Sequence, residues 1–338
     1  MEKILTVSIA AYNVEETLEE ALQPFVTCSC KEALDILIID DGSKDRTAEI
    51  AAKYEAEDPD VFRLVRKENG GWGSTLNTGM KLARGRYFKQ LDGDDYFSKE
   101  NLDGYLAFLK GCSADLIYTP FLTFDDHTGA VLRELGRYDR QLLPERKTLY
   151  LSEVTDFVPA MHTMTVRTEI LRRHPVHITE HCFYTDVEFV LKCCNFCRTM
   201  IYYELPVYYY RLARSGQSMS VEGIRRHYQD HLKMLYTMLA YEKRCVKETH
   251  VRRIFRERLS GVCDMQYKFF FALRPLGSVK KEVRQYDTIL KKQYPYYYER
   301  TNGKTMRLLR GVHFVGYRFL AAAADRIYQR AKAGVYEG

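Results

Sequence analysis

The sequence predicts an α/β fold with a mostly parallel central sheet covered by helices, followed by an α-helical C-terminal region. Apolar runs of strand length alternate with segments of helical spacing over residues 5–109, a pattern typical of parallel sheets with helical crossovers. Clusters of polar residues follow the ends of these runs. From about residue 221 the apolar spacing becomes helical and stays so. We therefore expect a first domain over residues 1–220 and a helical region over residues 221–338.

The elements of the first domain follow from local patterns. Strands are expected at residues 5–10, 36–39, 61–65 and 87–91, and helices at 14–22, 47–52, 74–83 and 99–109. The run at 36–39 is apolar without alternation, which fits a central strand buried on both faces. Ser43 or Asp45 can cap the helix that follows it. The helix at 14–22 is expected to end at Pro24.

Downstream of residue 110 the pattern is less regular. Further strands are expected at 116–118, 164–166, 199–203 and 207–211, with a helical turn at 169–173 and a helix at 187–197. Residues 121–146 are typical of a hairpin, because the turn formers Asp, Thr and Gly gather at 125–129.

Composition limits the function classes. The chain has 338 residues, of which 46% are apolar and 28% charged, values typical of globular proteins with a sizeable core. A formal net charge of +6 is compatible with anionic substrates or a membrane surface but is too small to indicate nucleic acid. Since no nucleic-acid motif is present either, we expect no nucleic-acid partner.

The N-terminus lacks the long apolar region of a signal peptide, and no run reaches eighteen apolar residues. The nine cysteines are then expected to be reduced thiols of a cytoplasmic protein. Five potential zinc ligands lie close in sequence, namely His181, Cys182, Cys193, Cys194 and Cys197. Because residues 187–196 have an apolar, helical pattern, we interpret these cysteines as buried structural thiols.

Four polar clusters follow the ends of the expected strands. They are Tyr12-Asn13, Asp40-Asp41, the glycine-rich residues 70–73 and the acidic residues 92–95. Parallel sheets bind ligands outside the carboxyl ends of their strands. We therefore expect the four clusters to meet at one edge of the sheet and to form the functional site.

The segment Asp92-Gly93-Asp94-Asp95 places three carboxylates within four residues. Like charges this close repel one another, and a divalent cation relieves the repulsion. Oxygen ligands favour Mg²⁺ or Mn²⁺, which also hold the phosphates of a substrate. An acidic surface turn without a metal is the alternative, since Asp and Gly are common turn residues.

Taken together, these loops resemble the inverting glycosyltransferases of family 2, which have the GT-A fold. The resemblance is carried by residues 8–13, 38–43, 77–79, 91–95, 184–186 and 210–220. It covers residues 4–220, whereas the C-terminal third resembles no family that we can name. It implies a nucleotide-sugar donor, most typically a UDP-sugar, and Mn²⁺ or Mg²⁺ as cofactor. The acceptor implied is a saccharide or a lipid-linked molecule in cell-surface polysaccharide biosynthesis.

The resemblance also implies roles for donor-binding residues. Asp41 would hydrogen-bond the uracil, and Ala10 and Tyr12 would line the base. Asn77 lies in a matching segment and would bind the donor as well. Arg211 and Arg214 would close over the diphosphate through bidentate contacts; solvated loop arginines are the alternative for both.

For the chemical step, the resemblance implies Asp94 as a metal ligand, and Asp92 as a contact to the ribose or to the metal and its water shell. Asp186 would be the general base that takes the proton from the acceptor hydroxyl. Family members often have Glu before this Asp, where the present chain has Thr. Glu180 and Glu188 are therefore secondary candidates for the base.

Two other functions remain open at this point. A nucleotidyltransferase would also use a metal and a nucleotide, but it normally needs a glycine-rich basic loop after the first strand, where this chain has residues 12–16. A non-catalytic nucleotide- or nucleic-acid-binding module is the second alternative. Hydrolysis of UDP-sugars in the presence of manganese would separate an enzyme from such a module.

Residues 301–338 contain seven basic residues, two acidic ones and interleaved apolar and aromatic residues. A basic amphipathic helix of this kind suits the surface of an anionic membrane. A helix that packs on the catalytic domain or on a second subunit is the alternative, and both stay open. The membrane alternative implies a cytoplasmic protein peripherally bound at the inner face of the cell membrane.

Overall fold

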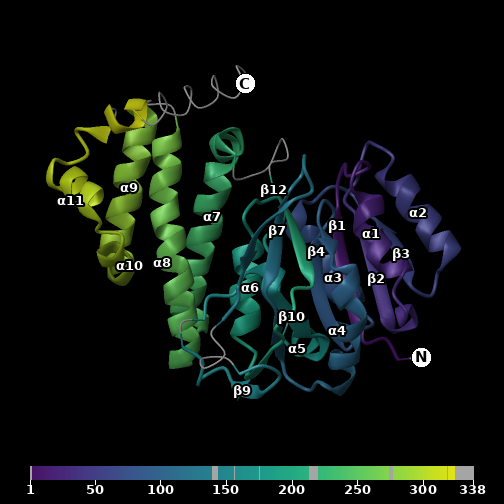
Figure 1. The fold of residues 1–338 in the computed structure, drawn as a ribbon. Coiled ribbons are helices and arrows are strands. Elements are labelled where there is room, and N and C mark those ends of the chain that lie inside the picture. Colours follow the sequence, from purple (N-terminus) through teal and green to yellow (C-terminus); the bar gives the residue numbers. More distant parts are fainter. Residues whose placement is uncertain are drawn as a thin grey trace. The chain divides into compact units, whose positions relative to one another are not determined.

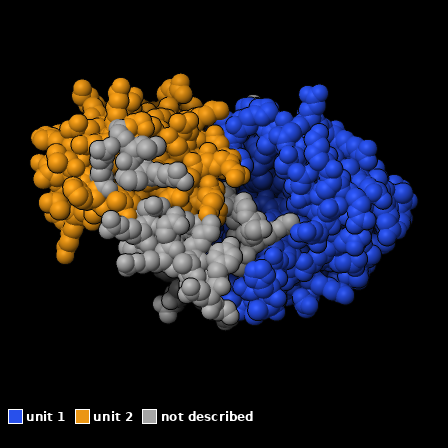
Figure 2. Space-filling model, turned by 90° about the horizontal axis from the view of Figure 1, so that it is seen from above, with its two compact units in different colours: residues 1–214 blue, residues 215–338 orange. Residues whose placement is uncertain are grey.

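The computed structural model describes residues 2–138, 144–155, 157–174, 176–212, 220–273, 277–317 and 319–323. The chain divides into two compact units, residues 1–214 and 215–338, which Figure 2 shows in separate colours. The first unit holds both β-sheets and the second is built from helices (Figure 1). The expected fold class, a helix-covered α/β unit followed by an α-helical region, is confirmed.

The first four strands of the large sheet are parallel. They are β1 (Leu5–Ala11), β2 (Leu34–Asp40), β3 (Phe62–Arg66) and β4 (Tyr87–Asp92), in the spatial order β3-β2-β1-β4. Every residue of β2 is buried, as its unbroken apolar run predicts. The carboxyl ends of β1, β2 and β4 therefore lie side by side at one edge.

The other half of the large sheet mixes strand directions. It continues β4-β10-β6-β11-β9, with β6 (Leu116–Tyr118), β9 (Thr148–Tyr150), β10 (Met164–Arg167) and β11 (Thr199–Tyr202). Strand β10 is antiparallel to both β4 and β6. Its first residues therefore lie at the same edge as the last residues of β4, which matters for the site below.

A smaller sheet has the order β5-β12-β7-β8, with β5 (Tyr96–Phe97), β7 (Phe121–Asp125), β8 (Val131–Leu135) and β12 (Tyr208–Leu212). The expected hairpin is present as β7 and β8, and Asp125 accepts hydrogen bonds from the turn between them. The segment expected as a strand at 207–211 pairs with β5 and β7 rather than with the large sheet.

Helices flank the large sheet (Figure 1). They are α1 (Leu18–Val26), α2 (Thr47–Glu57), α3 (Trp72–Leu82), α4 (Lys99–Gly111), α5 (Thr168–Arg173) and α6 (Asp186–Cys194), with short 3-10 turns at Lys31–Ala33 and Met161–Thr163. The expectation that the first helix ends at Pro24 is wrong, because α1 continues through it. Proline removes one helical hydrogen bond, but the continuation buries Phe25 against the ring of Phe97 at 5.3 Å.

The second unit consists of α7 (Val221–Cys245), α8 (Thr249–Ala272), α9 (Gly277–Gln293), α10 (Pro295–Arg300) and α11 (Lys304–Gly311). The Ser220 side chain caps α7 by accepting the backbone N–H of Gly223 at 3.0 Å. Among the helices of the described residues, none combines the length and the apolar character that a bilayer span requires.

Candidate active site

The site is organised around Asp92 at the end of β4. The indole Nε1 of Trp72, on the first turn of α3, donates a hydrogen bond to its Oδ1 at 2.6 Å. Burial raises the pKa of Asp92 to about 7, and the nearby charges of Asp94 and Asp186 act in the same direction, whereas the Trp72 bond opposes them. Asp92 therefore lies in a field of like charge, as the sequence predicts for this segment.

Gly93 brings the end of β4 against the end of β1. Its backbone N–H donates to the Ala10 carbonyl oxygen at 3.0 Å. A Cβ at this position would lie 2.8 Å from that same oxygen and 3.1 Å from the Val14 side chain. Only glycine fits the approach, so the acidic turn is fixed to the loop that follows β1.

Asp95 is buried beneath this turn and is 1% exposed. The Tyr208 hydroxyl donates to one of its oxygens at 2.5 Å, and the backbone N–H of Arg211 donates to the other at 2.8 Å. Burial raises the pKa of Asp95 well above its usual range, and Asp94 and Asp92 add to the effect. The side chain therefore ties the acidic turn to β12.

His162 is a candidate site residue that was not predicted from the sequence. In the pairing of β10 with β4, Val166 lies opposite Phe88, and this antiparallel register carries His162 toward Asp92. One ligand atom each from Asp92, Asp95 and His162 all lie within 4.8 Å of one another, which makes them a candidate metal group of the described residues. No local pattern signals His162, because its position depends on the antiparallel direction of β10.

The donor set of this group fits a divalent cation. Two carboxylates and an imidazole are ligands for Mn²⁺ and related metals, and oxygen-rich sites suit Mg²⁺. The raised pKa values of Asp92 and Asp95 reflect buried, crowded acidic groups that a cation would stabilise in the charged form. The carboxylate of Asp94 is not one of the three, but its charge raises the pKa of both neighbours. Its role as a metal ligand stays a prediction.

Asp186 lies on the first turn of α6, close enough for its charge to act on the acidic turn. Its charge raises the pKa of Asp92 and also that of Tyr210, whose hydroxyl is affected first by burial and then by Asp95, Asp92 and Asp94. The loop before α6 holds two non-glycine residues at positive φ, His181 at 49° and Tyr184 at 65°. Such backbone strain is concentrated at functional sites. The structure thus brings Asp186 to the same side of the sheet as Asp92.

The two secondary candidates for a base have other partners. Glu188 is 0% exposed and forms an ion pair with Lys192 at 2.8 Å. Glu180 is exposed and accepts a hydrogen bond from the Asn77 amide at 3.0 Å. Both side chains hold the loop that leads to α6, so the geometry favours Asp186 over either of them.

Asp41 fixes the glycine-rich loop after β3. Its carboxylate accepts from Lys67 Nζ at 2.6 Å and from the backbone N–H groups of Gly70 and Gly71 at 2.9 and 2.8 Å. The Gly70 carbonyl in turn accepts the backbone N–H of His181 at 2.6 Å. Asp41 therefore connects the edge of β2 with the loop before Asp186. Its predicted contact with a nucleobase is untested and stays a prediction.

Asn77 on α3 holds the same loop from another side. Its amide oxygen accepts the backbone N–H of Ile178 at 2.9 Å, and its amide nitrogen donates to the Ile178 carbonyl at 2.9 Å. These contacts position the loop, so the predicted donor contact of Asn77 remains a prediction. Ala10 lies opposite Asp92 near the end of β1, and Tyr12, just after that strand, has a side chain that is 49% exposed. An exposed ring at this edge is available for stacking on a base.

Arg211, on β12, holds the acidic turn through its side chain. Its Nε donates to the Asp94 carbonyl oxygen at 2.5 Å, and its guanidinium contacts the carboxylates of Glu20 and Asp126. The side chain is 6% exposed and lies over the Phe124 ring. Its predicted contact with a diphosphate stays a prediction, since these groups occupy the guanidinium here. Arg214 lies outside the described residues.

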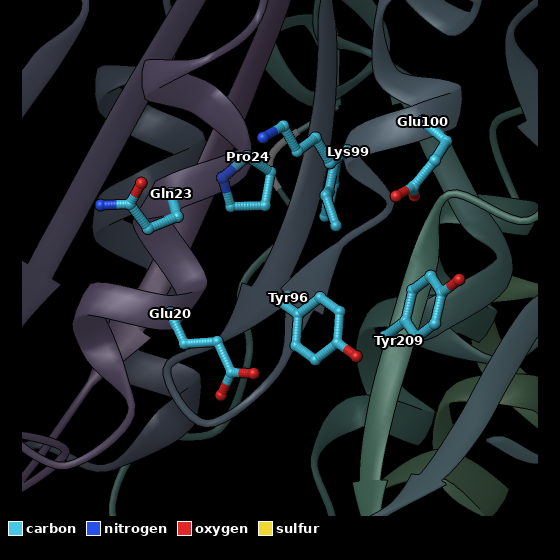
Figure 3. Close-up of a pocket in the computed structure, with 8 residues that line it drawn as sticks. Glu20, Gln23, Pro24, Tyr96, Lys99, Glu100 and Tyr209 are labelled. Atoms are coloured by element: carbon cyan, nitrogen blue, oxygen red, sulfur yellow. The ribbon is translucent and has the colours of Figure 1, made fainter. Parts of the chain in front are cut away.

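A shallow pocket of about 260 Å³ lies beside this cluster (Figure 3). Glu20 lines the pocket and also contacts Arg211. The rings of Tyr96 and Tyr209 stack at 4.8 Å along its wall. The pocket therefore adjoins the residues that hold the acidic turn, and helices α1 and α4 line it together with strands β5 and β12.

The cysteines of α6 and of the residues after it lie in an environment that disfavours thiolates. Cys193, Cys194 and Cys197 are buried, and burial raises the pKa of each thiol. Zinc binds thiolates, which this environment disfavours. Within the described part of the chain, no cysteine belongs to a candidate metal group. The interpretation as structural thiols fits both observations.

Comparisons with known proteins show the family and the fold of the chain. The family model described as glycosyl transferase family 2 matches residues 6–174, half of the chain. A curated relative from Bacillus subtilis, the uncharacterized glycosyltransferase EpsJ, is 37% identical over 95 residues. That alignment spans 28% of this chain and 27% of the relative.

Two solved structures share the fold. S. aureus TarS 1-349 in complex with UDP-GlcNAc has a TM-score of 0.63 at 20% identity and covers 97% of this chain and 92% of its own. The mannosyltransferase PcManGT from Pyrobaculum calidifontis, in complex with GDP-Man and Mn²⁺, has a TM-score of 0.53 at 15% identity and covers 96% and 87%. At these identities the likeness concerns the fold.

Proposed function

The chain belongs to glycosyl transferase family 2, and on this premise we propose that it transfers a sugar from a nucleotide-sugar to an acceptor hydroxyl with inversion at the anomeric carbon. The observation that carries the proposal is the meeting of Asp92 and Asp186 in one electrostatic field at the carboxyl edge of the sheet. Asp92 would hold a cation that neutralises the leaving diphosphate of a donor, and Asp186 would accept the proton of an acceptor.

The proposed donor is a UDP-sugar. Its base would lie against Ala10 and the exposed ring of Tyr12. The glycine-rich loop that Asp41 holds would lie along the nucleoside. The TarS complex with UDP-GlcNAc supports a UDP donor, although the GDP-Man complex of PcManGT shows that the same fold accepts another nucleotide. A panel of nucleotide-sugars in a thermal-shift assay identifies the donor, since the bound ligand raises the apparent melting temperature.

We assign the proposed Mn²⁺ or Mg²⁺ to the acidic turn, with Asp92 and Asp94 as ligands and Asp95 and His162 as further candidates. When bound, such an ion supplies positive charge where negative charge develops on the departing diphosphate. Trp72 orients Asp92 through its indole N–H, and Gly93 holds the turn against β1. These residues keep the acidic group in one place before any substrate arrives, which is the condition for electrostatic preorganisation.

In the proposed reaction, Asp186 accepts the proton of the acceptor hydroxyl while that oxygen attacks the anomeric carbon. The new carbon–oxygen bond forms on the face opposite the bond to the diphosphate, which breaks with its electron pair on the phosphate oxygen. One displacement of this kind inverts the anomeric configuration. A carboxylate within hydrogen-bond reach of the hydroxyl performs the proton transfer.

The acceptor that the family resemblance implies is a saccharide or a lipid-linked molecule in cell-surface polysaccharide biosynthesis. A lipid-linked acceptor and a cytosolic nucleotide-sugar meet at the inner face of the cell membrane, and we propose this peripheral location for the reaction. Transfer to soluble and to lipid-linked saccharide acceptors, measured side by side, identifies which kind is used.

The test combines binding and turnover in the full chain. With manganese we expect release of a nucleoside diphosphate from the cognate sugar donor, faster with acceptor. Asp186→Asn should reduce transfer by at least about a hundredfold while donor binding persists, and transfer at the wild-type rate would refute the base assignment. Release of pyrophosphate from a nucleoside triphosphate and a sugar phosphate would instead indicate a nucleotidyltransferase, and binding of the sugar donor without turnover would indicate a non-catalytic module.

A further inference from the structure

The C-terminal helical unit presents an exposed surface that its own fold does not use. We define this apolar-basic face by its exposed side chains, Lys304, Arg307, Leu308, Val312, Val315, Phe319 and Leu320. Phe319 is 81% exposed, Leu308 67% and Val315 65%. Isolated exposed apolar residues are ordinary, but five large ones within thirteen residues indicate an interaction surface.

The opposite side of the same segment is anchored firmly. Met306, Leu309, Phe314 and Tyr317 are buried, and the Tyr317 hydroxyl donates to the Phe270 carbonyl of α8 at 2.6 Å. Arg310 pairs with Asp287 of α9 at 2.7 Å. The segment thus packs within its own unit, whereas the alternative stated for this region was packing on the catalytic domain or on a second subunit. This internal packing leaves the apolar-basic face exposed.

Charge identifies the kind of surface that fits. No Asp or Glu occurs between Glu299 and Asp325. Lys304 and Arg307 are exposed, whereas Arg310 is neutralised by its buried pair. A second copy joined through the same face would bring these positive charges together, which is unfavourable. A surface that is apolar inside and negatively charged outside complements both properties.

We propose that the apolar-basic face binds peripherally to an anionic lipid bilayer. The apolar side chains enter the boundary between headgroups and acyl chains, and the Lys304 and Arg307 side chains contact lipid phosphates. The chain turns at His313 and Phe314, both at positive φ, so Val312 and Val315 lie on a compact turn. Contact with the bilayer does not depend on the proposed function, but delivery of the enzyme to a lipid-linked acceptor does.

The test uses the full chain and sedimentation with vesicles of phosphatidylglycerol and phosphatidylcholine, or of phosphatidylcholine alone. We expect binding to the anionic vesicles at low salt, weaker binding at high salt, and little binding to the neutral ones. The variant Leu308→Ser/Val315→Ser/Phe319→Ser should weaken binding by at least about tenfold, since each side chain loses its apolar transfer energy. Its melting temperature should be unchanged, because the three residues are exposed.

The matched control is Val131→Ser/Leu132→Ser/Leu135→Ser, which alters three exposed apolar side chains on β8. For charge, Lys304→Glu/Arg307→Glu should abolish binding, and Lys53→Glu/Lys110→Glu makes the same change of net charge at exposed positions of the first unit. The proposal is overturned if anionic vesicles do not bind at low salt, or if a control weakens binding as much as its test variant. It is also overturned if the test variants abolish self-association in sedimentation velocity and vesicles never bind, which would assign the face to a second copy.

Discussion

The pH dependence of metal binding provides the sharpest test of the site. Asp92 in the metal-free protein has a pKa of about 7, raised first by burial and then by Asp94. A cation that binds its carboxylate must displace the proton below that pH. Protonation of Asp92 alone should therefore lower the apparent affinity about tenfold for each pH unit below 7, and this contribution should level off above that pH. An Asp with an ordinary pKa, near 3.8, would give constant affinity over the same range.

The assay uses a property of the sequence. Trp72 is the only tryptophan of the chain, and its indole donates to Asp92. Its fluorescence therefore reports on the acidic turn without an added label, and paramagnetic Mn²⁺ should quench it. Titrations between about pH 5 and pH 8 give the apparent dissociation constant at each pH, and competition by Mg²⁺ controls for nonspecific quenching.

The variant Asp92→Asn separates this group from others at the site. Affinity should fall, and the part of the pH dependence centred near 7 should disappear. Stability gives an independent readout: the folded Asp92 retains a proton that the unfolded chain has lost between about pH 4 and 7. The stability of metal-free wild type relative to Asp92→Asn should thus decrease as pH rises across that window. A dissociation constant that is the same at pH 5 and pH 8 would refute the reasoning.

Three further predictions concern the residues that hold the site. Arg211→Ala leaves the carboxylates of Glu20 and Asp126 without their shared cation and removes a hydrogen bond to the acidic turn, so the free energy of unfolding should fall by about 3 kcal/mol. The control Arg146→Ala, at a more exposed ion pair, should lower it by less than about 1 kcal/mol. Equal losses of the two variants in chemical denaturation would contradict the assignment. Gly93→Ala should weaken Mn²⁺ quenching and lower the melting temperature because a Cβ lies 2.8 Å from a carbonyl oxygen, whereas Gly111→Ala, with nothing within 4 Å, should do neither. Tyr208→Phe removes the hydroxyl donor to the buried carboxylate at the turn and should weaken metal binding about tenfold at neutral pH; unchanged affinity in the same titration would show that the hydroxyl does not matter.

The strand and helix pattern of residues 5–109 could be predicted from sequence because each element carries its own local signal. β2 is an unbroken apolar run and is buried at every residue. The neighbouring parallel strands then place their loops at one edge, so the position of Asp92 at that edge could be predicted from the strand pattern, whereas its role was implied by the family resemblance. The two-residue β5 was missed, since a strand that short has no period to detect.

The remaining part of the site depends on contacts between distant segments. His162 lies near Asp92 only because β10 is antiparallel to β4, and the residues of β10 alone do not predict the direction of this pairing. The hydrogen bonds of Asp41 and Asn77 to their loops could not be predicted either, because the partners lie 26–30 and 101–103 positions away in the sequence. Sequence identified these residues as special, but only the structure shows which loops they hold.

The hydrogen bond from His181 to the Gly70 carbonyl has a kinetic consequence. This bond joins the glycine-rich loop at residues 70–73, which we expect to lie along the nucleoside, to the loop that precedes Asp186. Asn77 holds the second loop as well, through its hydrogen bond to the Ile178 carbonyl. Because the two segments are linked, we expect binding of the nucleotide-sugar at the first segment to order the second, where the acceptor would bind. Steady-state measurements with both substrates varied should then follow a compulsory order, in which the nucleotide-sugar enters first and the free nucleotide leaves last.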